Sequence, residues 1–156
     1  MTLAAGGRGH CMVAVHAPPV TLMAGGVPQA RLAVVVAAGY HVQANPASGN
    51  FFVPVELDLR AAGGVSPGKP VYPPGLPYCL PGESDDLMTY EGTLEIVVPL
   101  KAGASARPGN HVLKGALRYQ ACDARSCLFP ASVPVTLAVR VVAAPARPAR
   151  RRGGEG

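Results

Sequence analysis

The sequence predicts an all-β fold, an antiparallel β-sandwich of the immunoglobulin-like type, on three observations. Seventeen prolines and 19 glycines in 156 residues interrupt the chain too often for long helices. Hydrophobic residues still make up 49% of the chain, enough to bury one core. Between the interruptions, apolar and polar residues alternate with the period of two that half-buried strands show. About seven to nine short strands joined by Gly and Pro turns favour a sandwich that forms a single domain.

The expected strands follow one another along the chain. Clear alternation, with one apolar face, marks residues 53–60, 92–100, 111–121 and 132–141. Weaker candidates are residues 11–15, 31–37, 40–44 and 69–72. The stretches between them, such as AAGGVSPGKP, are rich in residues that form turns. Pro54, Pro99 and Pro134 fall inside expected strands, and we expect them at edges or bulges, because proline donates no hydrogen bond to a ladder.

Composition divides the chain into three parts. Residues 1–26 form an N-terminal segment with a candidate first strand, residues 27–142 form the domain, and residues 143–156 form a basic tail expected to be disordered. The tail holds +3 of the net charge of +5, which leaves only +2 for the rest. A solvated terminus is therefore expected rather than a contact with nucleic acid or an anionic membrane. Basic and aromatic residues do not interleave as they do where bases stack, so we expect no nucleic-acid partner.

The apolar runs are too short for a membrane span. The longest, LAVVVAA at 32–38, falls far below the ~18 residues that a spanning helix needs. We therefore expect a chain that is not transmembrane. Separately, we expect the protein to be a monomer. The first residues, MTLAAGGRGHC, do not show the charged start and apolar stretch of a secretory signal, which by itself indicates the cytoplasm.

Two of the four cysteines, Cys122 and Cys127, flank the loop DARS between two expected strands. Facing Cα atoms across an antiparallel pair lie roughly 4.5–5.5 Å apart, near the range of a disulfide. So short a ring contributes only ~2 kcal/mol in the chain-entropy model, against nearly ~5 kcal/mol for a loop of ~100 residues. Zinc needs two further ligands, and no second Cys or His pair follows. Three interpretations stay open: a structural disulfide or two buried thiols, a metal site, and a redox-active pair.

Four blocks of sequence, in order, carry a specific resemblance to a known family. They are GYHVQANPASGNFFVPVELDL (39–59), KPVYPP (69–74), TYEGTLEIVVPL (89–100) and LKGALRYQACDARSCLFP (113–130). Together they make the chain, from about residue 27 to residue 140, resemble the N-terminal domain of the thiol:disulfide interchange protein DsbD. The resemblance implies an immunoglobulin-like sandwich, in agreement with the alternation of the strands.

The resemblance also implies an activity. It implies a thiol-disulfide oxidoreductase of the protein-disulfide reductase type that works in the periplasm without a cofactor or a metal. Cys122 and Cys127 match the redox pair of the family, so that Cys127 would attack the disulfide of a client and Cys122 would resolve the mixed disulfide. The implied partners are thioredoxin-fold proteins and a membrane protein that conducts electrons. Since the N-terminus shows no signal, we expect that the natural start lies upstream of Met1 or that the chain is trimmed.

Two other function classes remain as alternatives. One is a non-catalytic immunoglobulin-like interaction module with a structural disulfide, and the other is a metal-binding sandwich.

Near the cysteine pair, Arg118 and Arg125 are expected to favour a thiolate and Asp123 to oppose it. His41 and Gln43 stand where the family resemblance implies aromatic groups that flank the sulfurs. We expect His41 to be a surface strand residue rather than an acid or base.

The loop LPYCLPGESDDLMTYEG departs from the family pattern. Shielding of the cysteine pair is expected there from Tyr78, Leu80 or Met88. Cys79 in this loop is expected as a small apolar residue, with approach to the pair as a third thiol as the alternative. Cys11 lies outside the resemblance and receives no role.

Overall fold

The computed structural model describes residues 12–49, 52–78 and 87–143. The chain forms twelve strands within these ranges. They are β1 (Val13–His16), β2 (Val20–Met23), β3 (Gln29–Val36), β4 (His41–Gln43), β5 (Glu56–Leu59), β6 (Val65–Pro67), β7 (Leu76–Tyr78), β8 (Leu87–Tyr90), β9 (Thr93–Ala102), β10 (Gly109–Tyr119), β11 (Ala121–Cys122) and β12 (Ala131–Val142). No helix in these ranges has the length and apolar character that crossing a bilayer requires. The prediction of an all-β, immunoglobulin-like fold is confirmed.

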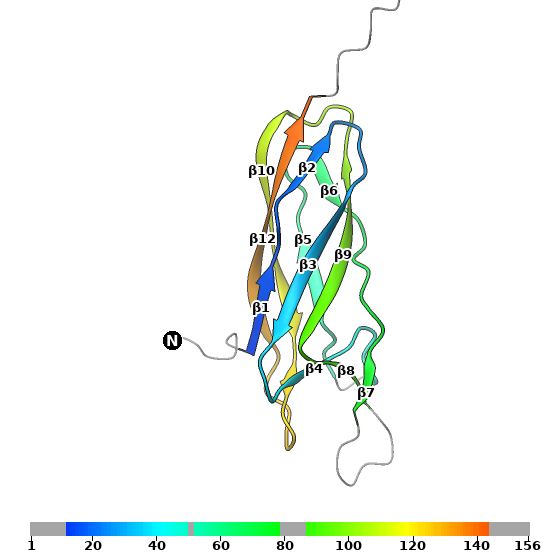
Figure 1. Ribbon diagram of the computed structural model, residues 1–156, viewed down its shortest axis with the longest axis vertical. Coiled ribbons are helices and arrows are strands. Elements are labelled where there is room, and N and C mark those ends of the chain that lie inside the picture. The colour runs from blue at the N-terminus through cyan, green and yellow to red at the C-terminus, as the bar shows by residue number, and fades with distance from the viewer. Residues whose placement is uncertain (1–11, 50–51, 79–86, 144–156) are drawn as a thin grey trace, which may run out of the picture.

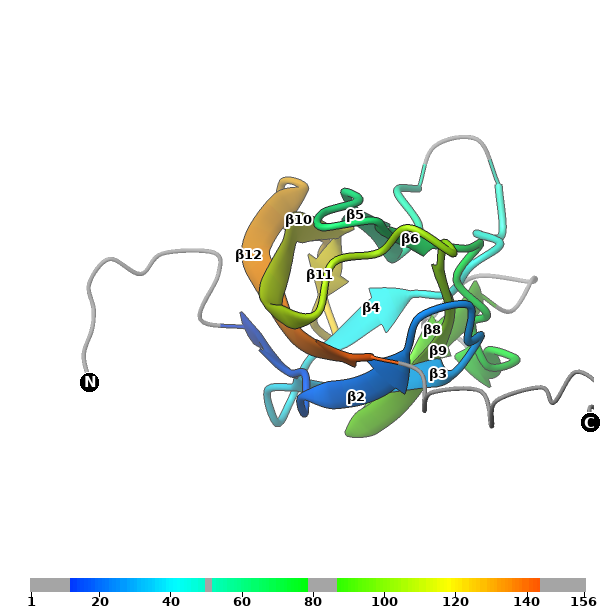
Figure 2. The same ribbon diagram turned by 90° about the horizontal axis from the view of Figure 1, so that it is seen from above.

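Two four-stranded sheets pack around one core, with the orders β1-β3-β9-β6 and β2-β12-β10-β5 (Figures 1 and 2). A third, smaller sheet of order β11-β4-β8-β7 lies at one end of the sandwich, the lower end in Figure 1. In the described part of the chain, ten of the twelve strands pair only with antiparallel neighbours. The exceptions are β2 and β12, which run parallel to each other and so depart from the predicted antiparallel sandwich. The small sheet includes the segment that carries Cys122.

The core is built from aliphatic side chains on the inner faces of the long strands. In β9, the buried Leu94, Ile96, Val98 and Leu100 alternate with more exposed residues, as the sequence predicted. In β10 and β12 the same alternation buries Leu113, Leu117, Val135, Leu137, Val139 and Val141. Their burial fixes the register of the long strands, because a slip of one residue would turn every apolar side chain to the solvent.

Several short strands lie where the sequence predicted turns or made no prediction. These are β2, β6, β7 and β8. Conversely, residues 69–72 form no strand; Val71 makes an isolated bridge to Val97 instead. Both β1 and β2 precede the expected domain boundary at residue 27, and they pair with β3 and β12 of the sandwich. The expected basic tail, apart from its first residue, lies outside the described residues.

The prolines expected at edges or bulges fall at irregular points of the ladders. Pro54 lies before β5 begins. Beside Pro99 the register along β9 steps by one residue, between the pair Pro67–Leu100 and the bridge Val71–Val97. Pro134 pairs with β10, while β2 joins β12 only from Val139 onward. An imino nitrogen without hydrogen is tolerated at such places, because the ladder is interrupted there already.

Candidate functional site

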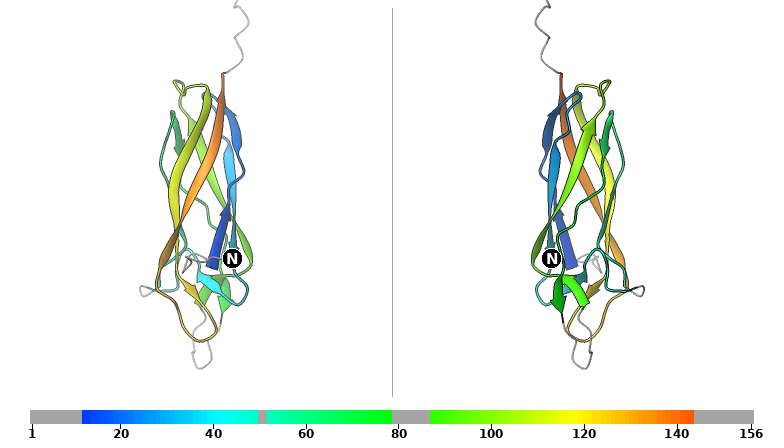
Figure 3. Two further views of the ribbon diagram at one scale, coloured as in Figure 1. Left: turned by 90° about the vertical axis from the view of Figure 1, so that its left-hand side faces the viewer. Right: turned by 90° about the vertical axis from the view of Figure 1, so that its right-hand side faces the viewer.

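The cysteine hairpin, residues 121–128, extends from the end of the sandwich that carries the small sheet (Figures 1 and 3). Strand β10 ends at Tyr119, and after Gln120 the chain leaves the β12 ladder and pairs with β4 as β11. Cys122 and Cys127 face each other in an isolated antiparallel bridge with a Cα–Cα distance of 3.9 Å. Their sulfurs form a disulfide with an S–S distance of 2.02 Å.

The turn of the hairpin is held by the side chain of Asp123. Its Oδ1 accepts hydrogen bonds from the backbone N–H groups of Arg125, at 2.8 Å, and Ser126, at 2.9 Å. The Asp123 N–H donates to the Ser126 carbonyl oxygen at 2.9 Å. Hydrogen bonds from Ser126 and Arg125 to the carboxylate hold the pKa of Asp123 below its usual range, because they favour the ionised form. These hydrogen bonds hold the loop between the two cysteines in addition to the disulfide.

Acidification is expected to weaken this turn. The pKa of Asp123 is lower in the folded than in the unfolded chain, so its stabilising contribution is complete above the unfolded pKa of about 4 and is lost as the pH falls through the folded pKa. An Asp123→Ala variant should unfold at a lower temperature than the wild type at pH 7, and the difference should shrink below pH 4. Thermal unfolding followed by circular dichroism across this range measures it. A difference that grows on acidification would contradict the assignment.

Residues on both sides of the hairpin anchor it to the sandwich. The Gln120 side chain accepts the Val53 N–H at 2.9 Å and donates through Nε2 to the Leu128 carbonyl oxygen at 3.3 Å. The Leu128 N–H donates to the Ala121 carbonyl oxygen at 2.8 Å. These bonds bind the two arms of the hairpin to each other and to the segment before β5. The disulfide is thus presented on a fixed support.

The two sulfur-bearing residues differ in exposure. Cys122 is buried, with 1% of its surface exposed, whereas Cys127 is exposed. The apolar residues that follow Cys127 also reach the solvent, Leu128 in part and Phe129 with 92% of its surface. Among the described residues, Cys127 is therefore the more accessible of the two cysteines.

Strand β4 supplies the neighbours of Cys122. His41 is the cross-strand partner of Cys122, and the Gln43 amide Nε2 donates to the Cys122 Sγ at 3.6 Å. The ring of Tyr78 lies against that of His41, with 4.0 Å between centroids and an interplanar angle of 33°. Burial lowers the pKa of His41, while the carboxylates of Glu91 and Asp123 act in the opposite direction. The neutral imidazole is therefore the form favoured by this environment.

The structure brings together the cysteine pair that the sequence singled out, and it corrects one expectation about its surroundings. His41 is buried, with 2% exposed, and not a surface residue, because β4 is an inner strand of the small sheet. Of the expected shielding residues, Tyr78 packs against His41, and Met88 is 42% exposed. Leu80, Cys79 and Cys11 lie outside the described residues.

The charged residues named from the sequence separate in the structure. Asp123 and Arg125 lie in the hairpin turn, while Arg118 lies back in β10 opposite Glu56 of β5. Among the described residues, no group of three His, Cys, Asp or Glu could hold a metal ion.

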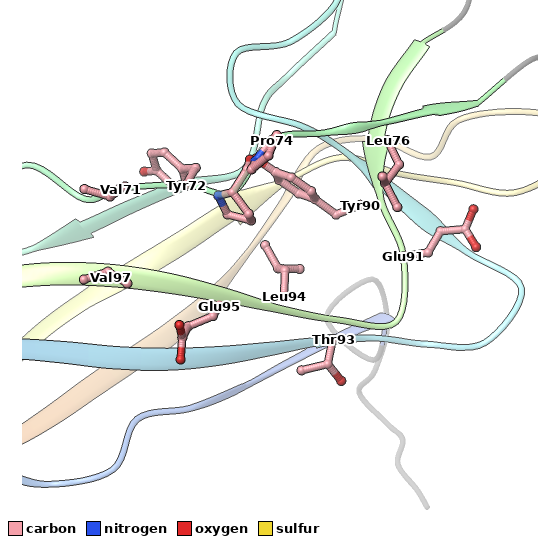
Figure 4. Close-up of a pocket in the computed structure, with 11 residues that line it drawn as sticks. Val71, Tyr72, Pro74, Leu76, Tyr90, Glu91, Thr93, Leu94, Glu95 and Val97 are labelled. Carbon is pink, nitrogen blue, oxygen red and sulfur yellow. The ribbon is translucent and has the colours of Figure 1, made fainter.

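A surface groove of about 550 Å³ lies beside this end of the sandwich and does not contain the cysteines (Figure 4). Its lining includes Tyr72, Leu76, Tyr90 and Glu91. The Tyr90 hydroxyl donates to the Pro73 carbonyl oxygen at 2.7 Å, and the Tyr72 hydroxyl accepts the Leu57 N–H at 2.9 Å. Burial raises the pKa of both tyrosines. The two hydroxyls thus serve to hold the segment between β6 and β7 against the sheets.

Comparison with known proteins places this arrangement in a wider context. The profile of the family described as thiol:disulfide interchange protein DsbD, N-terminal, matches residues 12–138. The solved N-terminal domain of DsbD from Neisseria meningitidis, in its reduced form, is 16% identical with a TM-score of 0.47, covering 73% of this chain and 85% of that one. The N-terminal periplasmic domain of ScsB from Proteus mirabilis is 19% identical with a TM-score of 0.53, covering 80% of this chain and 44% of that one. The likeness to ScsB shows a shared fold. No curated protein sequence gave a significant match.

Proposed function

Because the chain belongs to the family of DsbD N-terminal domains, we propose that it is a thiol-disulfide carrier that passes electrons to oxidised proteins through Cys122 and Cys127. The observation that supports this most directly is the disulfide with one buried and one exposed cysteine. In enzyme terms it is a protein-disulfide reductase. Its partners are thioredoxin-fold proteins and a membrane protein that conducts electrons, and its compartment is the periplasm, where disulfides persist.

The unequal exposure of the cysteines suggests their order of action. In the reduced protein, the Cys127 thiolate attacks one sulfur of a client disulfide, and the other client sulfur leaves as a thiolate. The Cys122 thiolate then attacks Cys127 Sγ, and the bond between Cys127 and the client breaks. The client has gained two electrons and two protons, and the carrier is left with the Cys122–Cys127 disulfide. A reduced donor must then reverse these steps to return the carrier to its dithiol form.

A purely structural purpose accounts poorly for this disulfide. Its ring spans a sequence separation of 5, for which the chain-entropy model gives only ~2 kcal/mol. The turn is already held by Asp123, and the arms by Gln120 and Leu128. We therefore expect the surrounding structure to persist when the bond opens.

A redox titration tests the proposal. The protein is equilibrated in a series of glutathione buffers, its free thiols are alkylated, and the number of blocked thiols is counted by mass. As the buffers become more oxidising, we expect the free thiols of Cys122 and Cys127 to be lost together, as one two-electron couple. This couple should be absent in Cys122→Ser and in Cys127→Ser. The alternative is an interaction module with a structural disulfide. It would be established if the Cys122–Cys127 disulfide stayed oxidised across the series and if Cys122→Ser and Cys127→Ser both bound a partner as the wild type does.

The exposed Phe129 is expected to contribute to docking with protein clients. A Phe129→Ala variant should reduce an oxidised thioredoxin-fold protein about tenfold more slowly, because a large exposed aromatic side chain two residues after Cys127 would be buried in the complex. Its reaction with oxidised glutathione, which has no such surface to cover, should keep the wild-type rate. Stopped-flow kinetics with both substrates give the comparison. Val27→Ala removes another exposed apolar side chain, 71% exposed, away from the hairpin, and should change neither rate.

A further inference from the structure

Two buried polar side chains beside Cys122 have atoms whose hydrogen-bonding capacity is unused. His41 and Gln43 are 2% and 0% exposed. Neither His41 Nε2 nor Gln43 Oε1 has a hydrogen-bond partner among the residues that the structure describes. Burying a polar atom without a partner costs free energy, so such atoms are rare in folded proteins. Two such atoms on the strand that pairs with Cys122 call for a chemical reason.

Strand pairing places both side chains on the same face as Cys122. His41 is directly opposite Cys122, and the Cβ atoms of such a pair lie about 4.5–5.5 Å apart. Gln43 follows two residues later in β4, and residues two apart in a strand share a face. The hydrogen bond of 3.6 Å from Gln43 Nε2 to Cys122 Sγ agrees with this placement.

We propose that Gln43 and His41 act on Cys122 in the resolving step, Gln43 by stabilising the Cys122 thiolate and His41 by accepting its proton. This inference rests on the proposed function. A disulfide sulfur is a weak acceptor, whereas a thiolate is a charged one, so the Gln43 hydrogen bond strengthens when the thiolate forms. Reduction also creates a Cys122 S–H, a donor that the disulfide lacks, on the strand face that carries the two unpartnered polar atoms.

The step balances in protons and electrons. In the mixed disulfide, Cys127 Sγ is bonded to a client sulfur and Cys122 carries a proton. The proton moves to His41, and the Cys122 thiolate attacks Cys127 Sγ. The bond between Cys127 and the client breaks, and the client sulfur leaves with the electron pair and takes a proton from solvent. The imidazolium returns its proton to solvent, and Cys122 and Cys127 are left as a disulfide.

The charges around His41 suit a proton acceptor. Three titratable groups from different elements lie near it: Tyr78 of β7, Glu91 after β8, and Asp123 of the hairpin. Burial favours the neutral ring, which can accept a proton. The two carboxylates favour the imidazolium, so they stabilise the ring once the proton has arrived.

The two cysteines can be observed separately with 5,5′-dithiobis(2-nitrobenzoic acid) as the probe. Cys11 and Cys79 are replaced by serine in the full chain, and the protein is reduced. It is then mixed with the probe in a stopped-flow instrument, with the protein in excess over the probe. Attack by Cys127 releases the first coloured thiolate, and resolution by Cys122 releases the second. His41→Phe, which keeps a ring against Tyr78, and Gln43→Met, of similar length, should leave the first phase within about twofold and slow the second by roughly tenfold or more.

The pH profile distinguishes chemistry from packing. In the wild type the second phase should slow on acidification as His41 becomes protonated, and His41→Phe should lose this inflection. In Gln43→Met the half-maximal rate of the second phase should move to higher pH. His41→Asn, which is polar but does not titrate, should behave as His41→Phe does. Thr89→Val is the matched control, because Thr89 is buried opposite Gln43 but has no hydrogen bond to either cysteine among the described residues.

Each outcome decides between the proposals. If both variants keep the wild-type rate and pH profile of the second phase, the roles of Gln43 and His41 are wrong while the carrier function stands. If Thr89→Val slows the second phase as much as His41→Phe does, the effect comes from packing and the inference is overturned. If the wild type releases only the first thiolate, Cys122 does not resolve and the proposed function itself fails.

Discussion

A reduced Cys122→Ser variant is expected to accumulate a stable mixed disulfide with an oxidised thioredoxin-fold protein, and a reduced Cys127→Ser variant is expected to form none. Cys127 is the cysteine that solvent and a partner can reach, whereas Cys122 is buried against β4. Removing Cys122 leaves the intermediate without its internal attacking sulfur, because a serine hydroxyl is not ionised near neutral pH. Acid quenching, alkylation and non-reducing electrophoresis measure the adduct.

The remaining cysteines require a control in this experiment. Both variants are therefore prepared with Cys11 and Cys79 also replaced by serine, so that any adduct comes from the hairpin. The chain with both hairpin cysteines present should show no lasting adduct, since the second cysteine resolves it. Equal adducts from the two variants, or an adduct from Cys127→Ser alone, would show that the assigned order of attack is wrong.

Replacing Gly115 with alanine is expected to lower the free energy of unfolding by at least about 3 kcal/mol and the melting temperature by roughly 10 °C. Gly115 lies in β10 between Leu59 of β5 and Val135 of β12. A Cβ atom there would overlap the Asp58 carbonyl oxygen and crowd the Leu59 backbone. Backbone atoms cannot rotate away as a flexible side chain can, so β5 would have to move from its place in the sheet. Denaturant unfolding of the oxidised protein gives the value.

Gly49→Ala is the matched control for this prediction. No heavy atom lies within 4 Å of a Cβ at Gly49, and its backbone is not in the left-handed region. Its free energy of unfolding should therefore change by no more than about 0.5 kcal/mol. A similar small change in Gly115→Ala would contradict the close approach of β5 to β10.

The sequence predicted those strands that have one buried and one solvated face. Strands β9, β10 and β12 are of this kind, and their alternation is visible in the residues alone. Strand β6, at Val65–Pro67, lies in a stretch of glycines and prolines, and only its pairing with β9 makes it a strand. Strand β7 has no alternation, because its residues are exposed or half-buried. Such strands depend on tertiary pairing, which local patterns do not encode.

The same distinction holds for the candidate site. The sequence permitted a disulfide between Cys122 and Cys127, since they flank a short loop between two clearly alternating segments, and the structure forms this bond. The resemblance placed His41 and Gln43 near the sulfurs, and both lie beside Cys122, but the burial of His41 was not predicted. YHVQA resembles a strand with one solvated face, yet all three residues of β4 are buried. Tyr78 packs against the His41 ring, and β11 and β8 flank β4 within the small sheet. The covering residues come from segments distant in the sequence, and no spacing of residues indicates them.

Strand β12 connects the hairpin end of the molecule to the opposite end (Figure 3). Its 12 residues, at about 3.3 Å each, span roughly 35–40 Å. A bead, a surface or a fusion partner joined after Val142 would sit several Debye lengths from the sulfurs, since that length is about 8 Å in physiological salt. Immobilising the protein by this end would orient it with the disulfide outward, and the rate of exchange measured on such a surface would be that of the free molecule.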